Sequence, residues 1–184
     1  MKVFITGHTS GIGLATFVLL KEQGYNVIGG SRRTGFDISD ERLYSQIFDC
    51  DVFINNSYHK TGQLNILEAV YNEWQNKSKT IINIGSWGKD NQQGRPLTRL
   101  NYNVAKKALE TYSFWIAEND LVCRSMVYNP GFVDTPLARK GCEDWPKEKI
   151  EEVLKRIMDP KECAKTIIFM IQNKYKFREI THHA

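Results

Sequence analysis

The N-terminal sequence contains the stretch Val3-Phe4-Ile5-Thr6-Gly7-His8-Thr9-Ser10-Gly11-Ile12-Gly13. Three apolar, β-prone residues are followed by a glycine-rich turn, and apolar residues then recur at helical spacing over 12–23, before Gly24. The stretch therefore predicts a strand, a tight turn and a helix. Unpaired amides and the dipole at such a helix start favour a bound phosphate, which small residues allow to approach closely. A tight turn without a ligand is the alternative interpretation.

Apolar strands and amphipathic helices alternate along the rest of the chain. We expect strands at 26–30, 51–54, 80–84 and 121–128, a short strand at 36–38, and helices at 40–48, 63–74 and 101–118. Asp159, Pro160 and Glu162 are residue types that begin helices, so a last helix is expected there. Because crossover helices cover both faces of a parallel sheet, the predicted fold is a Rossmann-type, doubly wound α/β sheet in three layers.

Length and composition indicate one packed domain over residues 1–184. Hydrophobic residues make up 41% of the chain and charged residues 25%, which is ordinary for a globular protein. The net charge is +4, from 25 Lys and Arg against 21 Asp and Glu. No dense basic run is present, which argues against nucleic acid as the main partner. The glycine-rich turn interrupts the uncharged stretch 3–20, so we expect neither a membrane span nor a secretory signal.

The metal-ligating residue types are scattered. The four cysteines, Cys50, Cys123, Cys142 and Cys163, lie far apart without a C-x-x-C pair. This spacing indicates reduced thiols and a cytoplasmic location rather than a zinc site or a disulfide framework. His182 and His183 have no third ligand nearby, so we expect an exposed tail rather than a metal site.

Two groups of residues have types suited to chemistry. A Rossmann-like site usually has an acidic residue after its second strand, which binds the ribose of NAD, but here the sequence is Ser31-Arg32-Arg33. A guanidinium binds phosphate, so these residues indicate the 2′-phosphate of NADP, with NAD and two solvated arginines as alternatives. Tyr102 and Lys106 lie one helical turn apart, a spacing that also occurs by accident.

These pieces occur in an order that resembles the short-chain dehydrogenase/reductase family across nearly the whole chain. The glycine motif is similar to that of its single-domain main branch, of which this would be an unusually short member. The joint order is specific, whereas each motif alone is not. The matching positions are Gly7, Gly11 and Gly13; Asn55-Asn56-Ser57, where the family has Asn-Asn-Ala-Gly; Ser86; Tyr102 with Lys106; and Asn129-Pro130-Gly131 with Val133 and Thr135.

The resemblance implies an NADP-dependent oxidoreductase that transfers a hydride between nicotinamide and a small-molecule carbonyl or alcohol. Ser86 would hold the carbonyl oxygen, Tyr102 would donate the proton, and Lys106 would bond the nicotinamide ribose. Lys106 and an oxidised nicotinamide would lower the pKa of Tyr102 by roughly 2 to 3, equivalent to about 3 to 4 kcal/mol. Asn65 is the best positional match for the active-site asparagine. The expected cofactor contacts are Gly7, Thr9, Ser10, Gly11, Ile12, Gly13, Ser31, Arg32, Arg33, Asp37, Asn55, Asn56, Ser57, Tyr102, Lys106, Pro130, Gly131, Val133 and Thr135.

The chain also departs from the family pattern. A helix between the second and third strands is missing, and the end, 180–184, lacks the usual glycine-rich terminal strand. A homodimer or homotetramer is the expected assembly. We expect Tyr58, His59, Trp87 and the segment 136–145 to line the substrate pocket, and this segment, which has no clear helical periodicity, to be a mobile lid or a fixed connection.

Two other functions fit parts of the pattern. A catalytically silent NAD(P)-binding regulatory protein would need the glycines and Arg32, but not the combination of Ser86, Tyr102 and Lys106. A nucleotide-sugar epimerase or dehydratase would have the same tyrosine and lysine. Its larger substrate domain does not fit into 184 residues.

Overall fold

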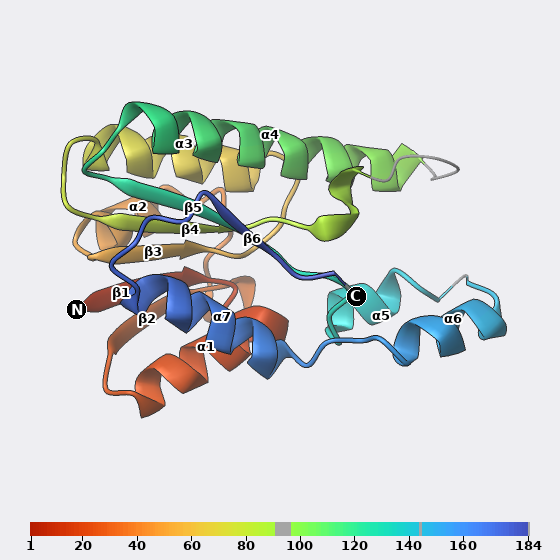
Figure 1. Cartoon of the computed structure of the whole chain (residues 1–184). Coiled ribbons are helices and arrows are strands. Elements are labelled where there is room, and N and C mark those ends of the chain that lie inside the picture. The colour runs from red at the N-terminus through yellow and green to blue at the C-terminus, as the bar shows by residue number, and fades with distance from the viewer. Residues whose placement is uncertain (91–96, 144, 184) are drawn as a thin grey trace.

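The computed structural model describes residues 1–90, 97–143 and 145–183. Its parallel strands form one sheet in the order β2-β1-β3-β4-β5-β6, with helices on both faces (Figure 1), so the predicted doubly wound α/β class is confirmed. The strands are β1 (Lys2–Thr6), β2 (Asn26–Gly30), β3 (Val52–Asn55), β4 (Thr80–Ile84), β5 (Arg124–Asn129) and β6 (Glu179–Thr181). The helices are α1 (Gly11–Glu22), α2 (Arg42–Phe48), α3 (Gly62–Trp74), α4 (Leu97–Asn119), α5 (Pro136–Lys140), α6 (Lys147–Leu154) and α7 (Pro160–Gln172), with 3-10 turns η1 (Arg32–Thr34) and η2 (Trp87–Asp90).

Two apolar clusters form the core, one on each face of the sheet. Alternate side chains of a strand point to opposite faces, so Val3 and Ile5 pack in the cluster beneath α1 and α7, and Phe4 packs in the cluster beneath α2, α3 and α4. Side chains of this kind contribute roughly 1.5 to 3 kcal/mol each when fully buried. The two-sided burial explains why the strands are apolar throughout.

The structure corrects one expectation about secondary structure and decides two points that the sequence left open. Residues 36–38 form no strand, because Asp37 makes a local turn with Ser39. Ile38 is buried in the core, and Phe36 packs against it from the loop. A terminal strand does exist, since β6 pairs in parallel with β5 and places Tyr128 opposite Ile180. Part of the segment 136–145 is helical, because the Thr135 hydroxyl accepts a hydrogen bond from the Ala138 amide and begins α5. Position 144 of that segment lies outside the described residues.

The strand order places a topological switch point between β1 and β3. The chain leaves these two neighbouring strands toward opposite faces of the sheet, α1 covering one face and α3 the other (Figure 1). In open α/β sheets, ligands bind outside the carboxyl ends of the strands at such a point. Helices α5 and α6 also follow the carboxyl end of β5 and project away from the sheet. A ligand site is therefore expected at the carboxyl edge of the sheet, near β1 and β3.

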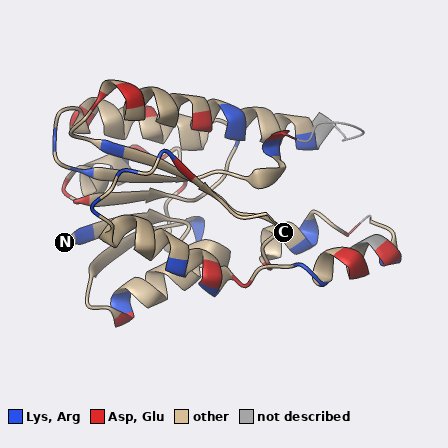
Figure 2. Ribbon diagram, viewed as in Figure 1, with Lys and Arg blue, Asp and Glu red and all other residues tan. Residues whose placement is uncertain are grey.

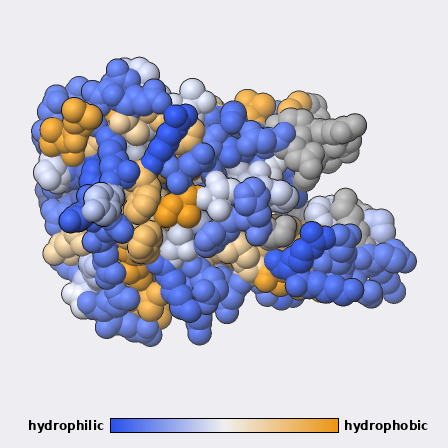
Figure 3. Space-filling view, viewed as in Figure 1, coloured by the Kyte–Doolittle hydropathy of each residue, from blue (hydrophilic) through white to orange (hydrophobic). Residues whose placement is uncertain are grey.

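The surface has charges of both signs. Lys and Arg are interspersed with Asp and Glu along the chain (Figure 2), and on the face in Figure 3 hydrophobic residues gather near β6 and α7 while the α5–α6 projection is mainly hydrophilic. Among the residues described, no helix is both long enough and apolar enough to span a membrane.

Candidate active site

The glycine-rich turn forms a cradle at the start of α1. Gly7 and Gly11 have φ values of 72° and 53°, in the left-handed region that favours glycine. A Cβ at Gly13 would lie 2.3 Å from the carbonyl oxygen of Gly7, so a side chain there would collide with the turn. Ser10 is the N-cap residue, and its hydroxyl makes no capping hydrogen bond. The first amides of α1 are thus held where a phosphate group could reach them.

The end of β3 is bonded to the end of β1 across the switch point. The Thr6 hydroxyl accepts hydrogen bonds from the amides of Asn56 and Ser57 at 2.9 and 3.0 Å. The Asn56 side chain donates to the carbonyl oxygen of Thr6 at 2.9 Å. These hydrogen bonds hold Asn56 and Ser57 next to the end of β1, where the glycine turn begins.

The residues after β2 form the rim of the cradle. The Thr9 hydroxyl lies 3.2 Å from the Ser31 hydroxyl, and the Arg33 guanidinium donates to the Thr9 carbonyl oxygen at 3.2 Å. Arg32 is exposed at the same edge. Ile12 lies farther in and packs against the core. Ser31 and the two arginines are therefore adjacent to the glycine turn.

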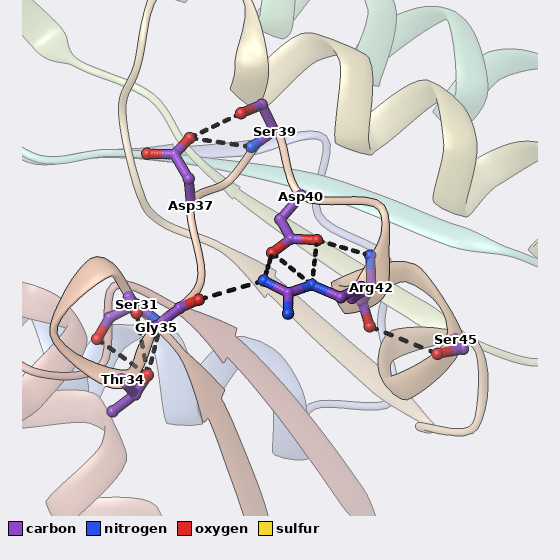
Figure 4. A network of polar contacts seen from close by, with 8 residues as sticks. All are labelled: Ser31, Thr34, Gly35, Asp37, Ser39, Asp40, Arg42 and Ser45. Atoms are coloured by element: carbon purple, nitrogen blue, oxygen red, sulfur yellow. Dashed lines mark hydrogen bonds and ion pairs between the residues drawn. The ribbon is translucent and has the colours of Figure 1, made fainter.

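Asp37 lies in the loop beyond this rim. It accepts hydrogen bonds from the Ser39 amide and hydroxyl at 3.1 and 2.9 Å, and these bonds lower the pKa of Asp37 (Figure 4). Its carboxylate is also 3.6 Å from His59 Nδ1. Close by, Arg42 forms an ion pair with Asp40 and donates to the Gly35 carbonyl oxygen (Figure 4). His59, which we expected in the substrate pocket, thus lies beside Asp37 at the rim of the cradle.

Tyr102 and Ser86 meet at the carboxyl end of β4. The Ser86 side chain is hydrogen-bonded to the Tyr102 side chain. The Tyr58 ring packs edge-on against the Tyr102 ring, with centroids 4.7 Å apart. Burial raises the pKa of Tyr102, while the Ser86 hydrogen bond and the charge of Arg99 lower it. The net direction is upward, opposite to the shift that we expected for the holoenzyme, so in the free protein Tyr102 stays protonated at neutral pH.

Lys106 is buried one turn after Tyr102, with 3% of its surface exposed. Its ammonium donates to the Gln63 side-chain oxygen at 2.8 Å and to the Ile84 carbonyl oxygen at 2.6 Å. It also lies 5.6 Å from the centroid of the Tyr102 ring. Burial lowers the pKa of Lys106 to about 7. Lys106 therefore titrates near neutral pH, and its proton depends on two neutral acceptors.

The sequence analysis overlooked Gln63. Its side-chain nitrogen donates to the carbonyl oxygens of Asn55 and Ile84 at 2.6 and 3.1 Å. The nitrogen and the oxygen of the Gln63 amide are therefore both hydrogen-bonded, the oxygen to Lys106. Asn65, which we expected here, is exposed two positions further along α3, and Lys106 donates to Gln63 instead. The position on α3 that contacts Lys106 is therefore Gln63. Its place at the start of the helix, eight residues after Asn55, was the only sequence signal.

A second buried network supports the Ser86 loop. Asn129, at the end of β5, accepts a hydrogen bond from the Ser86 amide at 3.0 Å and donates to Glu110 at 3.1 Å. Glu110 also pairs with Lys89 at 2.8 Å. Burial opposes ionisation of Glu110, but the hydrogen bonds from Lys89, Lys107 and Asn129 outweigh it and lower the pKa. Nothing in the sequence pattern singled out Glu110.

The loop after β5 connects Ser86 with the glycine turn. Pro130 accepts a hydrogen bond from the Trp87 amide at 3.0 Å, and Gly131 follows it. Val133 is buried and bridges to Met158, ahead of α7. A Cβ at Gly11 would lie 2.9 Å from the Thr135 methyl group. The predicted nicotinamide-side loop thus lies between Ser86 and the cradle.

The C-terminus contacts the same edge. His182 Nδ1 lies 3.0 Å from the Tyr128 hydroxyl, so the expectation of a wholly exposed tail was wrong for this residue. The His183 ring packs edge-on against Trp87, with centroids 5.7 Å apart. The rings of Trp87 and His183 border an open hollow between η2, α4 and β6. Ser86, Tyr102 and Lys106 are not among the residues that line this hollow. Trp87, which we expected to line the substrate pocket, thus lines this hollow.

Comparison with known proteins identifies the fold. No family model and no curated protein matches the chain. Among solved structures, 3-alpha-hydroxysteroid dehydrogenase from Pseudomonas sp. B-0831, complexed with NADH, is similar at 20% identity and a TM-score of 0.76, over 98% of this chain and 94% of that one. A short-chain dehydrogenase/reductase (glucose/ribitol dehydrogenase) from Brucella melitensis is similar at 16% identity and a TM-score of 0.79, over 98% and 93%.

Actinorhodin polyketide ketoreductase, as a variant with NADPH, is similar at 18% identity and a TM-score of 0.78, over 99% of this chain and 95% of that one. The chain has the fold of the short-chain dehydrogenases/reductases. Because a fold can host several activities, the reaction must be argued from the site.

Proposed function

We propose that this protein is an NADP-dependent oxidoreductase that transfers a hydride between nicotinamide and a small-molecule carbonyl or alcohol. The observation that carries the proposal is the meeting of Ser86, Tyr102 and Lys106 at the carboxyl edge of the sheet, beside the cradle at the start of α1. A protein that only binds a dinucleotide has no need of a phenol, a hydroxyl and an ammonium placed together.

The cradle fits a dinucleotide. A Cβ at Gly13 would fill the turn, and Gly7 has a φ of 72°, in the left-handed region that favours glycine. Gly7 to Gly13 would hold the pyrophosphate, Ser31 to Arg33 the adenosine side, and Asn55 to Ser57 the middle of the cofactor. Lys106 would bond the nicotinamide ribose, and Pro130 to Thr135 would border the nicotinamide.

The side chains then have separate roles in carbonyl reduction. When bound, the nicotinamide supplies the hydride. The Ser86 hydroxyl holds the carbonyl oxygen, and Tyr102, which burial keeps protonated, donates its proton to that oxygen as charge develops there. The ammonium of Lys106, 5.6 Å from the Tyr102 ring centroid, stabilises the tyrosinate that remains. Alcohol oxidation uses the same groups in reverse.

The test is a panel of small aldehydes and ketones assayed by the loss of NADPH absorbance. Turnover that disappears in Tyr102→Phe supports the proposal. Tight NADPH binding without turnover of any compound would instead support the regulatory alternative, and absence of binding would overturn both.

We expect NADPH to bind more tightly than NADH, because Arg32 and Arg33 follow β2 where an acidic residue would select NAD. A charge-assisted hydrogen bond to the 2′-phosphate contributes about 1.5 to 3 kcal/mol, or roughly one to two orders of magnitude in Kd. Fluorescence titration measures both cofactors. Arg32→Ala should reduce the preference. Arg42→Ala is the matched control, since this arginine is already paired with Asp40. Equal affinities in the unaltered protein would contradict the NADP assignment.

Gln63 should set the pH range of activity through Lys106. Gln63→Met removes a neutral acceptor from the ammonium, so the pKa of Lys106 should fall below about 7 and the alkaline limb of kcat/KM should move to lower pH. Gln63→Glu adds a negative charge beside the ammonium, which should raise the pKa of Lys106 and move the alkaline limb of kcat/KM to higher pH. Opposite movements identify a positioning role, because a merely structural residue would lower activity at every pH.

Asn65→Ala is the control on the same helix, and its exposed side chain predicts an unchanged profile. If Asn65→Ala moved the alkaline limb while both Gln63 variants left it in place, the assignment of the α3 position would be wrong.

A further inference from the structure

Arg99 lies on the first turns of α4, one turn before Tyr102. Its guanidinium carbon is 5.9 Å from the centroid of the Tyr102 ring. Its charge acts on the phenol, where it favours the tyrosinate. A cation in this place faces the same ring whose hydroxyl would transfer the proton.

Among the described residues, Arg99 has no ion-pair partner. Within ranges 1–90, 97–143 and 145–183, no carboxylate lies within ion-pair distance of Arg99, and its guanidinium lies near the Tyr102 ring. The neighbouring cations differ: Lys107 pairs with Asp90 and Glu110, and Arg139 on α5 pairs with Asp134 at 2.6 Å. Arg99 can therefore bind an external anion without breaking a salt bridge to any residue that the structure describes.

Helix α5 shows that Arg99 lies beside the reaction site rather than on an outer surface. Its N-cap, Thr135, is packed against Gly11 of the cradle. Its C-cap, Gly141, lies at the other end, where a Cβ would be 3.7 Å from Arg99 Nη2. The helix thus spans from the phosphate cradle to Arg99, and a substrate at Tyr102 lies next to this guanidinium.

We propose that Arg99 binds an anionic group of the substrate, so that the preferred substrates are carbonyl compounds with a carboxylate or a phosphate a few bonds from the carbonyl. This inference rests on the proposed oxidoreductase function and adds the substrate class to it. A guanidinium binds either oxyanion through two parallel hydrogen bonds, and both would place the carbonyl carbon near Tyr102.

The experiment compares matched pairs of substrates with NADPH. Short 2-oxo and 3-oxo carboxylates are compared with their ethyl esters, and an oxo-alkyl phosphate is compared with the corresponding hydroxy ketone. We expect kcat/KM to favour the anion over its neutral partner by about 10- to 100-fold. The difference should lie mainly in KM. The carboxylate and phosphate arms show which oxyanion is preferred.

Arg99→Gln should abolish the preference, and Arg99→Lys should keep part of it. The ratio within a pair is the informative quantity, because the loss of the Arg99 charge also raises the pKa of Tyr102 and slows both members alike. Arg139→Gln is the control and should leave the ratio unchanged. If esters and acids are reduced equally well, or Arg99→Gln preserves the ratio, the inference is overturned while the oxidoreductase function stands. If no compound is reduced at all, the proposed function itself fails.

Discussion

Tyr102→Phe should reduce turnover by about a hundredfold to ten-thousandfold while leaving the Kd of NADPH nearly unchanged. The substitution removes the proton donor but keeps the ring, which packs edge-on against Tyr58 at 4.7 Å. The phosphate cradle is formed by other residues, so cofactor binding does not depend on the phenol. Stopped-flow measurement of hydride transfer, with fluorescence titration of NADPH, separates the two quantities.

Lys106→Ala is the comparison variant and should impair both turnover and cofactor binding, because its ammonium would contact the ribose as well as stabilise the tyrosinate. Thermal unfolding is the check on folding, since Lys106 is buried against Gln63 and Ile84. Near-normal hydride transfer in Tyr102→Phe would show that another group provides the proton.

Gly13→Ala should weaken NADPH binding by about a hundredfold and lower the free energy of unfolding by about 1 to 3 kcal/mol. The new methyl carbon would lie 2.3 Å from the Gly7 carbonyl oxygen and 2.7 Å from the Asn56 side-chain nitrogen. The Gly7 carbonyl belongs to the backbone and cannot rotate away as a flexible side chain can. The turn must therefore open, which moves its amides out of the position where they would bind the phosphate. Calorimetric titration and chemical denaturation measure the two effects.

Gly24→Ala provides the matched control. Gly24 has a φ of 80°, but no heavy atom lies within 4 Å of a Cβ placed there. The variant should lose about 1 to 2 kcal/mol of stability through backbone strain alone, with the affinity for NADPH unchanged. A Gly13→Ala protein that binds NADPH as tightly as the unaltered chain would refute the cradle.

Local patterns were sufficient for the main elements. The apolar run of β3 and the helical spacing from Tyr102 onward each depend on residues a few positions apart, so periodicity revealed them. The same reasoning misassigned residues 36–38, because a three-residue apolar run has no decisive period and Ile38 is buried without joining the sheet. It also overlooked α5, although Thr135 and Pro136 are the residue types that begin helices.

The partner of Lys106 depended on tertiary structure. Gln63 and Asn65 are two positions apart on α3, and two positions correspond to a rotation of about 200° around a helix. One of them must therefore face the site and the other solvent. Which one faces inward is decided by how α3 packs on the sheet, through contacts that join residues 43 positions apart in the chain.

By itself, the sequence determined the doubly wound class, the glycine cradle and the order of Ser86, Tyr102 and Lys106, because these follow from residue types at short spacings. Only the tertiary structure decided which side chains support them: Gln63 on Lys106, Asn129 on the Ser86 amide, and the guanidinium of Arg99 near the Tyr102 ring. The physical reason is that hydrogen bonds and charge interactions act across a few ångströms of space, and burial sets their strength. Neither distance nor burial is a property of position along the chain.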